Sequence, residues 1–186
     1  MSAPTPDSPE ARRRSGRLKL ALMAAFFALP VAASFLIWTL DLAPGTTSNY
    51  GTLLPPKPVP LPEAPALKGK WVLVTFAGGA CDARCERLLY FVRQVRRAQG
   101  RESDRIARLW LVTDAVAPRP EVLAAIAGSV VAPAGGRRDF PAETDPADHV
   151  YLVDPLGNLM MRFPRDPDPA RVIKDLQRLL RASSFG

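Results

Sequence analysis

Residues 70–85 read KWVLVTFAGGACDARC and contain both cysteines of the chain. Their first seven residues are mostly apolar, β-branched or aromatic, which is typical of a buried strand. From Ala83 to Gln99 apolar residues recur on one helical face, and Gly100 follows, so this run predicts an amphipathic helix. Cys81 and Cys85 therefore lie where a strand turns into a helix. Positions four apart on a helix share one face, so both sulfurs are expected to point the same way.

Two cysteines in this arrangement suit three kinds of chemistry. The positive end of the helix dipole, with Arg84 and Arg87 nearby, favours thiolates. A thiolate pair can form a reversible disulfide or bind one soft metal ion such as Cu(I). A stabilising disulfide is the third interpretation, although an i, i+4 pair within a helix is near the limit of disulfide geometry.

Hydrophobic patterning predicts that strands and helices alternate after this corner. The further elements are strands at Ile106–Thr113, Val150–Asp154 and Leu159–Phe163, and helices at Arg119–Ala127 and Asp168–Ala182. Residues 129–148 are expected to be irregular. The order β-α-β-α-β-β-α predicts an α/β domain over residues 67–183. In open α/β sheets ligands bind at the carboxyl ends of strands, which is where the cysteines lie.

The N-terminal part of the sequence predicts a membrane anchor. Leu20–Leu40 is a run of 21 residues without a charge, long enough to cross a bilayer about 30 Å thick. All five basic residues of segment 1–19 precede it, so we expect a disordered cytoplasmic tail and residues 41–186 on the other side. In a bacterium, a chain with this arrangement is expected to be a single-pass inner-membrane protein with a periplasmic domain. The periplasm is a compartment in which disulfides persist. A cleaved signal peptide is the alternative, but its apolar core is usually shorter.

Residues 41–66 contain seven prolines, which favour an extended polyproline spacer. The alternative is that Asn49–Leu54 packs onto the domain as an extra strand.

These residues resemble the thioredoxin-like superfamily, and within it the Sco family of membrane-anchored proteins. The resemblance covers about Leu67–Ala182 and the single N-terminal anchor. It is carried by the Cys-x-x-x-Cys spacing of residues 81–85, by Leu111–Asp114 with Pro120–Leu123, and by Tyr151–Asn158.

The resemblance implies a protein that assists the assembly of cytochrome c oxidase, with a respiratory oxidase subunit as a partner. Cys81 and Cys85 would bind Cu(I) or keep the thiols of a copper site reduced. His149, the only histidine, is the candidate third ligand.

Several positions depart from the family pattern. Sco proteins usually carry prolines where this chain has Asp82 and Glu86. Their copper-binding histidine corresponds to Pro146, and His149 lies three residues later. Thiol oxidoreductases of this fold place a cis-proline at the position of Asp148.

Two other functions stay open. One is a thiol–disulfide oxidoreductase with a different client, in which Cys81 attacks and Cys85 resolves. The other is a non-catalytic assembly module. The net charge is +7, but residues 69–186 hold 18 Lys/Arg against 14 Asp/Glu, without the dense basic stripe of a nucleic-acid-binding protein. The arginines at positions 93, 96, 97, 101, 105 and 108 are expected to form a solvated face, with docking to acidic lipid headgroups or a partner as the alternative.

Overall fold

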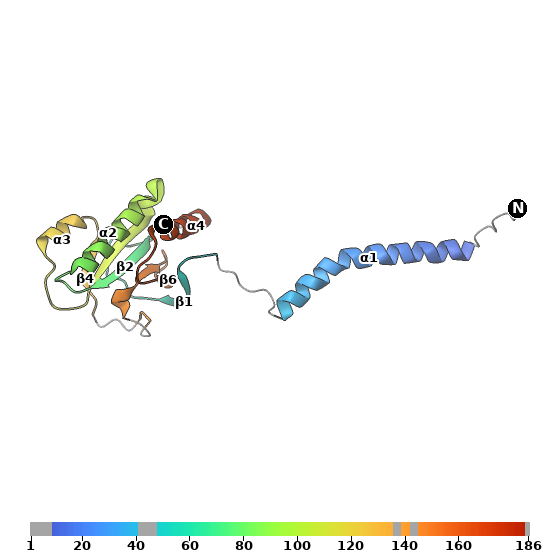
Figure 1. Ribbon diagram of the computed structural model, residues 1–186, viewed down its shortest axis with the longest axis horizontal. Helices are drawn as coiled ribbons and strands as arrows, with labels where there is room; N and C mark the ends of the chain where they lie inside the picture. Colours follow the sequence, from blue (N-terminus) through green and yellow to red (C-terminus); the bar gives the residue numbers. More distant parts are fainter. Residues whose placement is uncertain (1–8, 41–47, 136–138, 142–144, 185–186) are drawn as a thin grey trace. The chain divides into compact units, whose positions relative to one another are not determined.

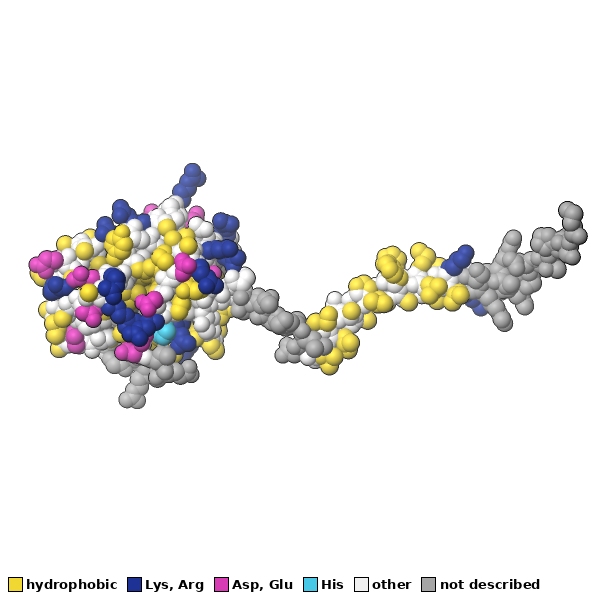
Figure 2. All heavy atoms as spheres, in the orientation of Figure 1, with side chains coloured by type: hydrophobic (Ala, Val, Ile, Leu, Met, Phe, Trp, Pro, Cys, Tyr) yellow, Lys and Arg dark blue, Asp and Glu magenta, His cyan; other side chains and the backbone are white. Residues whose placement is uncertain are grey.

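The structure is a computed structural model that describes residues 9–40, 48–135, 139–141 and 145–184. The chain divides into two compact units, Met1–Thr47 and Ser48–Gly186. In the first unit, α1 (Pro9–Thr39) contains a stretch, Gly16–Thr39, that is long and apolar enough to cross a membrane. Apolar side chains cover it in Figure 2. The helix begins at Pro9, so the expectation of disorder is wrong for residues 9–19. Pro is favoured in the first turn of a helix, and the Glu, Ala and Arg residues that follow are good helix formers.

The second unit is built on one six-stranded sheet in the order β1-β6-β5-β2-β3-β4 (Figure 1). The strands are β1 (Thr52–Pro58), β2 (Trp71–Ala77), β3 (Ile106–Val112), β4 (Val130–Pro133), β5 (Val150–Val153) and β6 (Asn158–Phe163). The helices are α2 (Ala83–Arg97), α3 (Pro120–Ala125) and α4 (Pro169–Ala182), with 3-10 turns at Gly100–Arg105 and Pro146–Asp148. Strands β2, β3 and β4 run parallel, whereas β5, β6 and β1 join the sheet in antiparallel pairs. All seven predicted elements of the α/β domain are present, so its predicted fold class is confirmed.

The structure contains two strands, β1 and β4, that the predicted order lacks. Strand β4 forms inside the segment expected to be irregular. Strand β1 pairs with β6 at the edge of the sheet, so the expected spacer is wrong over Thr52–Pro58. The alternative of an extra strand at Asn49–Leu54 is correct for Thr52–Leu54, and the strand continues to Pro58. Its pairing shifts between Leu53 and Lys57, where Pro55 and Pro56 lie. Proline has no N–H to donate, and an edge strand with a bulge tolerates it. Residues 41–47 of the predicted spacer lie outside the described residues.

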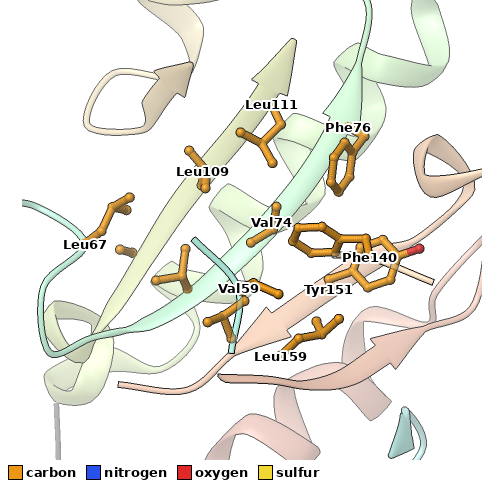
Figure 3. Close-up of a cluster of buried hydrophobic side chains, with 12 residues drawn as sticks. Val59, Leu67, Val74, Phe76, Leu109, Leu111, Phe140, Tyr151 and Leu159 are labelled. Atoms are coloured by element: carbon orange, nitrogen blue, oxygen red, sulfur yellow. The ribbon is translucent and has the colours of Figure 1, made fainter. Parts of the chain in front are cut away.

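The sheet has a hydrophobic cluster on each face. Helices α2 and α4 pack on one face, with Leu73, Val95 and Leu176 buried between helix and strand. The other face is covered by residues from loops and from β1, and its rings of Phe76, Phe140 and Tyr151 meet edge to face (Figure 3). Side chains alternate between these faces along each strand. In β3, Ile106, Arg108, Trp110 and Val112 therefore belong to the helix-covered face.

Candidate redox site at Cys81 and Cys85

Cys81 and Cys85 form a disulfide at the carboxyl end of β2, a central strand of the sheet. Their Cα atoms are 5.1 Å apart. Both cysteines are buried, with 3% and 5% of their surface exposed. They pack in a cluster with Leu89, Trp110 and Val122 on the helix-covered face. The sulfurs are therefore held in an apolar setting at a strand end.

The two cysteines lie on either side of the start of α2. Asp82 is the N-cap residue, and its carboxylate accepts a 2.8 Å hydrogen bond from the backbone N–H of Cys85. Cys81 precedes the helix with φ = +46°, the only positive φ of a non-glycine residue among the described residues. A left-handed conformation costs an L-residue roughly 1–2 kcal/mol. The expectation that both cysteines occupy one helical face is therefore wrong, since Cys81 reaches Cys85 by turning back across the N-cap.

Arg119 holds the backbone of Cys81 from the neighbouring segment. Its Nη2 donates a 2.9 Å hydrogen bond to the carbonyl oxygen of Cys81 and also contacts Glu86 in an ion pair. Sequence reasoning did not single out Arg119, because it lies 38 residues away and only the fold brings it to the corner.

Asp114 fixes the loop before the cysteines. Its Oδ1 accepts a 2.8 Å hydrogen bond from the backbone N–H of Gly79. A Cβ at Gly79 would overlap the carbonyl oxygen of Val116, so the two loops approach too closely for a larger residue. Asp114 belongs to the stretch Leu111–Asp114 that resembles the Sco family, and its position just after β3 indicates that it lies at this edge of the sheet.

Asp148, at the position of the cis-proline in thiol oxidoreductases, binds the cysteine corner through an ion pair. Its Oδ1 lies 2.6 Å from Nη1 of Arg84 and 3.3 Å from Nε of Arg165. The hydrogen bond from Arg84 is the largest cause that lowers the pKa of Asp148, and the charges of Arg165, Arg84 and His149 act in the same direction. The described residues contain no cis peptide bond. A carboxylate thus stands beside the disulfide corner.

His149 is engaged elsewhere. Its Nδ1 donates a 2.8 Å hydrogen bond to the carbonyl oxygen of Phe163, and its ring lies 6.1 Å from that of Tyr151. Tyr151 belongs to the cluster on the face opposite the cysteines. Within the described ranges, no three His, Cys, Asp or Glu side chains form a group that could hold a metal ion. The structure brings Cys81 and Cys85 together but does not join His149 to them.

A cavity of about 280 Å³ opens beside the disulfide. It is lined by Phe76, Cys81, Asp82, Arg84, Cys85 and Ala147, among others. Nη2 of Arg84 is buried without a hydrogen-bond partner in the described structure. A thiol or a polypeptide segment that enters this cavity would meet both cysteines.

Comparison with known proteins agrees with this architecture. Residues 71–183 match the family described as "Transmembrane-like, thioredoxin-like, C-terminal domain". The chain belongs to this family. No curated protein matches the chain significantly.

Two solved Sco structures share the fold. The apo Sco1 protein of Thermus thermophilus is 22% identical, with a TM-score of 0.52 over 73% of this chain and 99% of that chain. Yeast Sco1 with copper bound is 16% identical, with a TM-score of 0.54 over 63% of this chain and 82% of that chain. At these identities the likeness establishes the fold, and the predicted thioredoxin-like fold of Sco type is confirmed.

Proposed function

We propose that this protein is a membrane-anchored thiol–disulfide exchange protein that keeps the cysteines of a copper site reduced during assembly of a respiratory oxidase. The Cys81–Cys85 disulfide at the carboxyl end of β2 is the observation that carries this proposal. The link to oxidase assembly rests on the resemblance to Sco proteins.

Three features support redox cycling over a purely structural disulfide. The bond closes a loop of only a few residues, so it restricts the unfolded chain less than a long-range bond would. Cys81 adopts a costly left-handed conformation to form it. Both cysteines also line a cavity through which a client segment can approach.

The proposed step conserves electrons and protons. The Cys81 thiolate attacks one sulfur of a client disulfide, forms a mixed disulfide and releases a client thiolate. The Cys85 thiolate then attacks Cys81, which reforms the Cys81–Cys85 bond and releases the second client thiolate. Two electrons pass to the client, and the two protons of the cysteine thiols end on the client thiols. A dithiol reductant must then reduce the pair for another cycle.

Cu(I) remains a prediction, and the described residues do not fit the three-ligand site expected from the sequence. The reduced cysteines would supply two soft thiolate donors. His149, the expected third donor, contacts Phe163 and Tyr151 instead. For this reason no step of the proposed function passes through copper.

We place the protein in a bacterial inner membrane, with its N-terminus in the cytoplasm and Ser48–Gly186 in the periplasm. The basic residues before the apolar part of α1 support this orientation. The oxidising periplasm would also allow the disulfide to form.

A trapping experiment in bacteria that express the full chain tests the proposal. In a Cys85→Ser variant the mixed disulfide between Cys81 and its client lacks a resolving thiol and should accumulate. The Cys81→Ser variant is the matched control. We expect covalent capture of a copper-site oxidase subunit by Cys85→Ser alone. Capture by neither variant, together with a wild-type reduction potential below about −300 mV, would overturn the proposal because such disulfides are structural.

A further inference from the structure

An open groove of about 580 Å³ lies between α2 and α3. The two helices lie side by side in Figure 1. The apolar floor of the groove comes from Leu89, Val122 and Ile126, which are buried in the same cluster as Cys81 and Cys85. The groove is separate from the cavity that the two cysteines line, but it shares their packing. A molecule in the groove therefore lies close to the disulfide.

Arg119 joins the groove to the disulfide. It lines the groove at the N-cap position of α3, and its Nη2 donates a 2.9 Å hydrogen bond to the carbonyl oxygen of Cys81. At the α2 wall, Ala83 lines the groove, while its neighbours in the chain, Asp82 and Arg84, line the cavity beside the disulfide. The first turn of α2 therefore separates the two hollows, and one extended segment can pass from the groove to the disulfide.

The rim of the groove is exposed and suited to binding a protein. Tyr90 lies on it with 61% of its surface exposed. Ala83 and Ala125 line the groove from α2 and α3, and their small side chains leave it open. Tyrosine and arginine are enriched in protein interfaces and among the residues that contribute most to binding. An exposed tyrosine above a buried apolar floor therefore favours a polypeptide as the occupant.

The charges of the groove favour an acidic segment. Arg87 and Arg93 lie on the α2 wall, and Glu121 lies on the α3 wall. Glu86 and Arg119, which also line the groove, form an ion pair with each other. Arg93 donates to a backbone carbonyl oxygen of α3 at 3.1 Å, and within the described ranges neither Arg93 nor Arg87 has a carboxylate partner. The α2 wall therefore offers two cations to a carboxylate that enters the groove.

The arginine face predicted from the sequence is only partly exposed. Arg97 and Arg101 are exposed as expected. Arg108 lies on the helix-covered face of β3 with 5% of its surface exposed, so the expectation of a solvated side chain is wrong for this residue. Arg93 lines the groove. A partner that binds to this face would therefore meet Arg93 in the groove.

We propose that the groove binds the client polypeptide of the thiol exchange as an extended segment, with an apolar side chain on the floor and a carboxylate at Arg87 and Arg93. This proposal rests on the proposed function and names its client class, a protein with an apolar and an acidic residue beside its disulfide. Each arginine would donate charge-assisted hydrogen bonds to the carboxylate. The segment would continue past Ala83 into the cavity beside the disulfide.

Reduction of disulfide peptides by the full chain in detergent micelles tests the proposal. Three cyclic peptides carry the same disulfide ring and differ only in the two residues after it: leucine and aspartate, leucine and lysine, or serine and aspartate. The protein is reduced first, and exchange is followed by acid quenching and mass spectrometry. We expect the leucine–aspartate peptide to react fastest. Serine in place of leucine should slow the reaction about tenfold, the equivalent of burying about half of a leucine side chain.

Two variants place the effect in the groove. Arg87→Gln should slow the leucine–aspartate peptide about threefold, the size of an exposed ion pair, and remove most of its advantage over the leucine–lysine peptide. Ala125→Phe fills the groove from an exposed position, so it should slow both leucine peptides about tenfold. Arg97→Gln is the matched control, because it removes the same charge from an exposed position of α2 outside the groove and should leave all rates unchanged.

Hydroxyethyl disulfide, which is too small to need the groove, is reduced in parallel to measure the cysteines alone. Equal rates for the three peptides, or a leucine–aspartate rate that neither Arg87→Gln nor Ala125→Phe lowers, would overturn the docking site and leave the proposed function standing. Equal slowing of the small disulfide would also overturn it, because the variants would then act on the cysteines themselves. If neither the peptides nor the small disulfide react, the proposed function fails and the docking site fails with it.

Discussion

Replacing Arg119 with methionine should make the Cys81–Cys85 disulfide easier to reduce. Arg119 donates to the carbonyl oxygen of Cys81, the residue held at φ = +46°. Once the disulfide is reduced, Cys81 can relax to an ordinary backbone conformation and lose this contact. The hydrogen bond therefore stabilises the oxidised form more than the reduced form. Methionine keeps an unbranched apolar stem of similar length while removing the donors.

The size of the effect follows from the hydrogen bond and its exposure. A hydrogen bond from a charged donor contributes about 1.5–3 kcal/mol. The Arg119 side chain is 49% exposed, so solvent screening favours a smaller value, about 1–1.5 kcal/mol. For a two-electron couple 30 mV corresponds to about 1.4 kcal/mol, so the potential should rise by about 20–30 mV.

The assay is equilibration of the full chain with glutathione buffers, followed by alkylation of free thiols and mass spectrometry. Glu86→Gln is the matched control, because it removes the ion-pair partner of Arg119 and leaves the donor to Cys81 in place. Its potential should stay within about 10 mV of the wild type. If Arg119→Met leaves the potential unchanged or makes it more negative, the proposed role of Arg119 is wrong.

Three further changes test individual contacts. Asp148→Asn should lower the free energy of unfolding at pH 7, as measured by chemical denaturation. Arg84 lowers the pKa of Asp148 in the folded state. The extra free energy of unfolding of the wild type over Asp148→Asn should therefore be complete above the unfolded pKa of about 3.9 and should decrease as the pH falls through the folded pKa. A difference that is undiminished at pH 2 would contradict this role of the Arg84–Asp148 ion pair. Asp175→Ala removes the two hydrogen bonds that the carboxylate accepts from backbone N–H groups just before β1. It should lower the free energy of unfolding by about 3–5 kcal/mol and speed amide exchange in β1. Unchanged exchange in β1 would show that Asp175 does not hold this strand. Gly79→Ala places a methyl group against the Val116 carbonyl and should cost about 1–3 kcal/mol, seen as a lower melting temperature; an unchanged melting temperature contradicts the close approach.

The central strands and the flanking helices were predictable because their signal is local. Strands β2 and β3 are nearly continuous apolar runs, and both are buried along almost their whole length. In α4, Val172, Leu176 and Leu180 recur at helical spacing and lie in the core as that spacing predicts. Such patterns require no knowledge of distant contacts.

Strand β1 was hidden by its prolines. A run that contains Pro55, Pro56 and Pro58 has the composition of a spacer, and only pairing with a distant partner makes it a strand. The residues just before it are held by the buried carboxylate of Asp175, more than 120 residues away. The local sequence does not indicate which distant strand will pair with this run or which side chain will hold the residues before it.

The Cys81–Cys85 disulfide was one of the expectations from the sequence, but its conformation was not. The spacing of the two cysteines at a strand-to-helix corner suggested that they lie close together and left a disulfide and a metal site open. The start of the helix at Ala83, with Asp82 before it, was also visible, but the left-handed turn at Cys81 depends on tertiary contacts such as the one from Arg119. Nonlocal hydrogen bonds of this kind leave no pattern in the sequence.

The two residues at the entry to β5, Asp148 and His149, make different contacts that bear on copper binding and on thiol exchange. Asp148 ends the 3-10 turn Pro146–Asp148, and His149 lies between this turn and the start of β5 at Val150. Asp148 reaches the cysteine corner through Arg84, whereas His149 contacts Tyr151, which belongs to the cluster on the face opposite the cysteines. For His149 to become a third copper donor, its ring would have to leave the carbonyl oxygen of Phe163 and turn toward the cysteines. Thiol exchange needs only the two sulfurs and access to them, and both are supplied by the present arrangement.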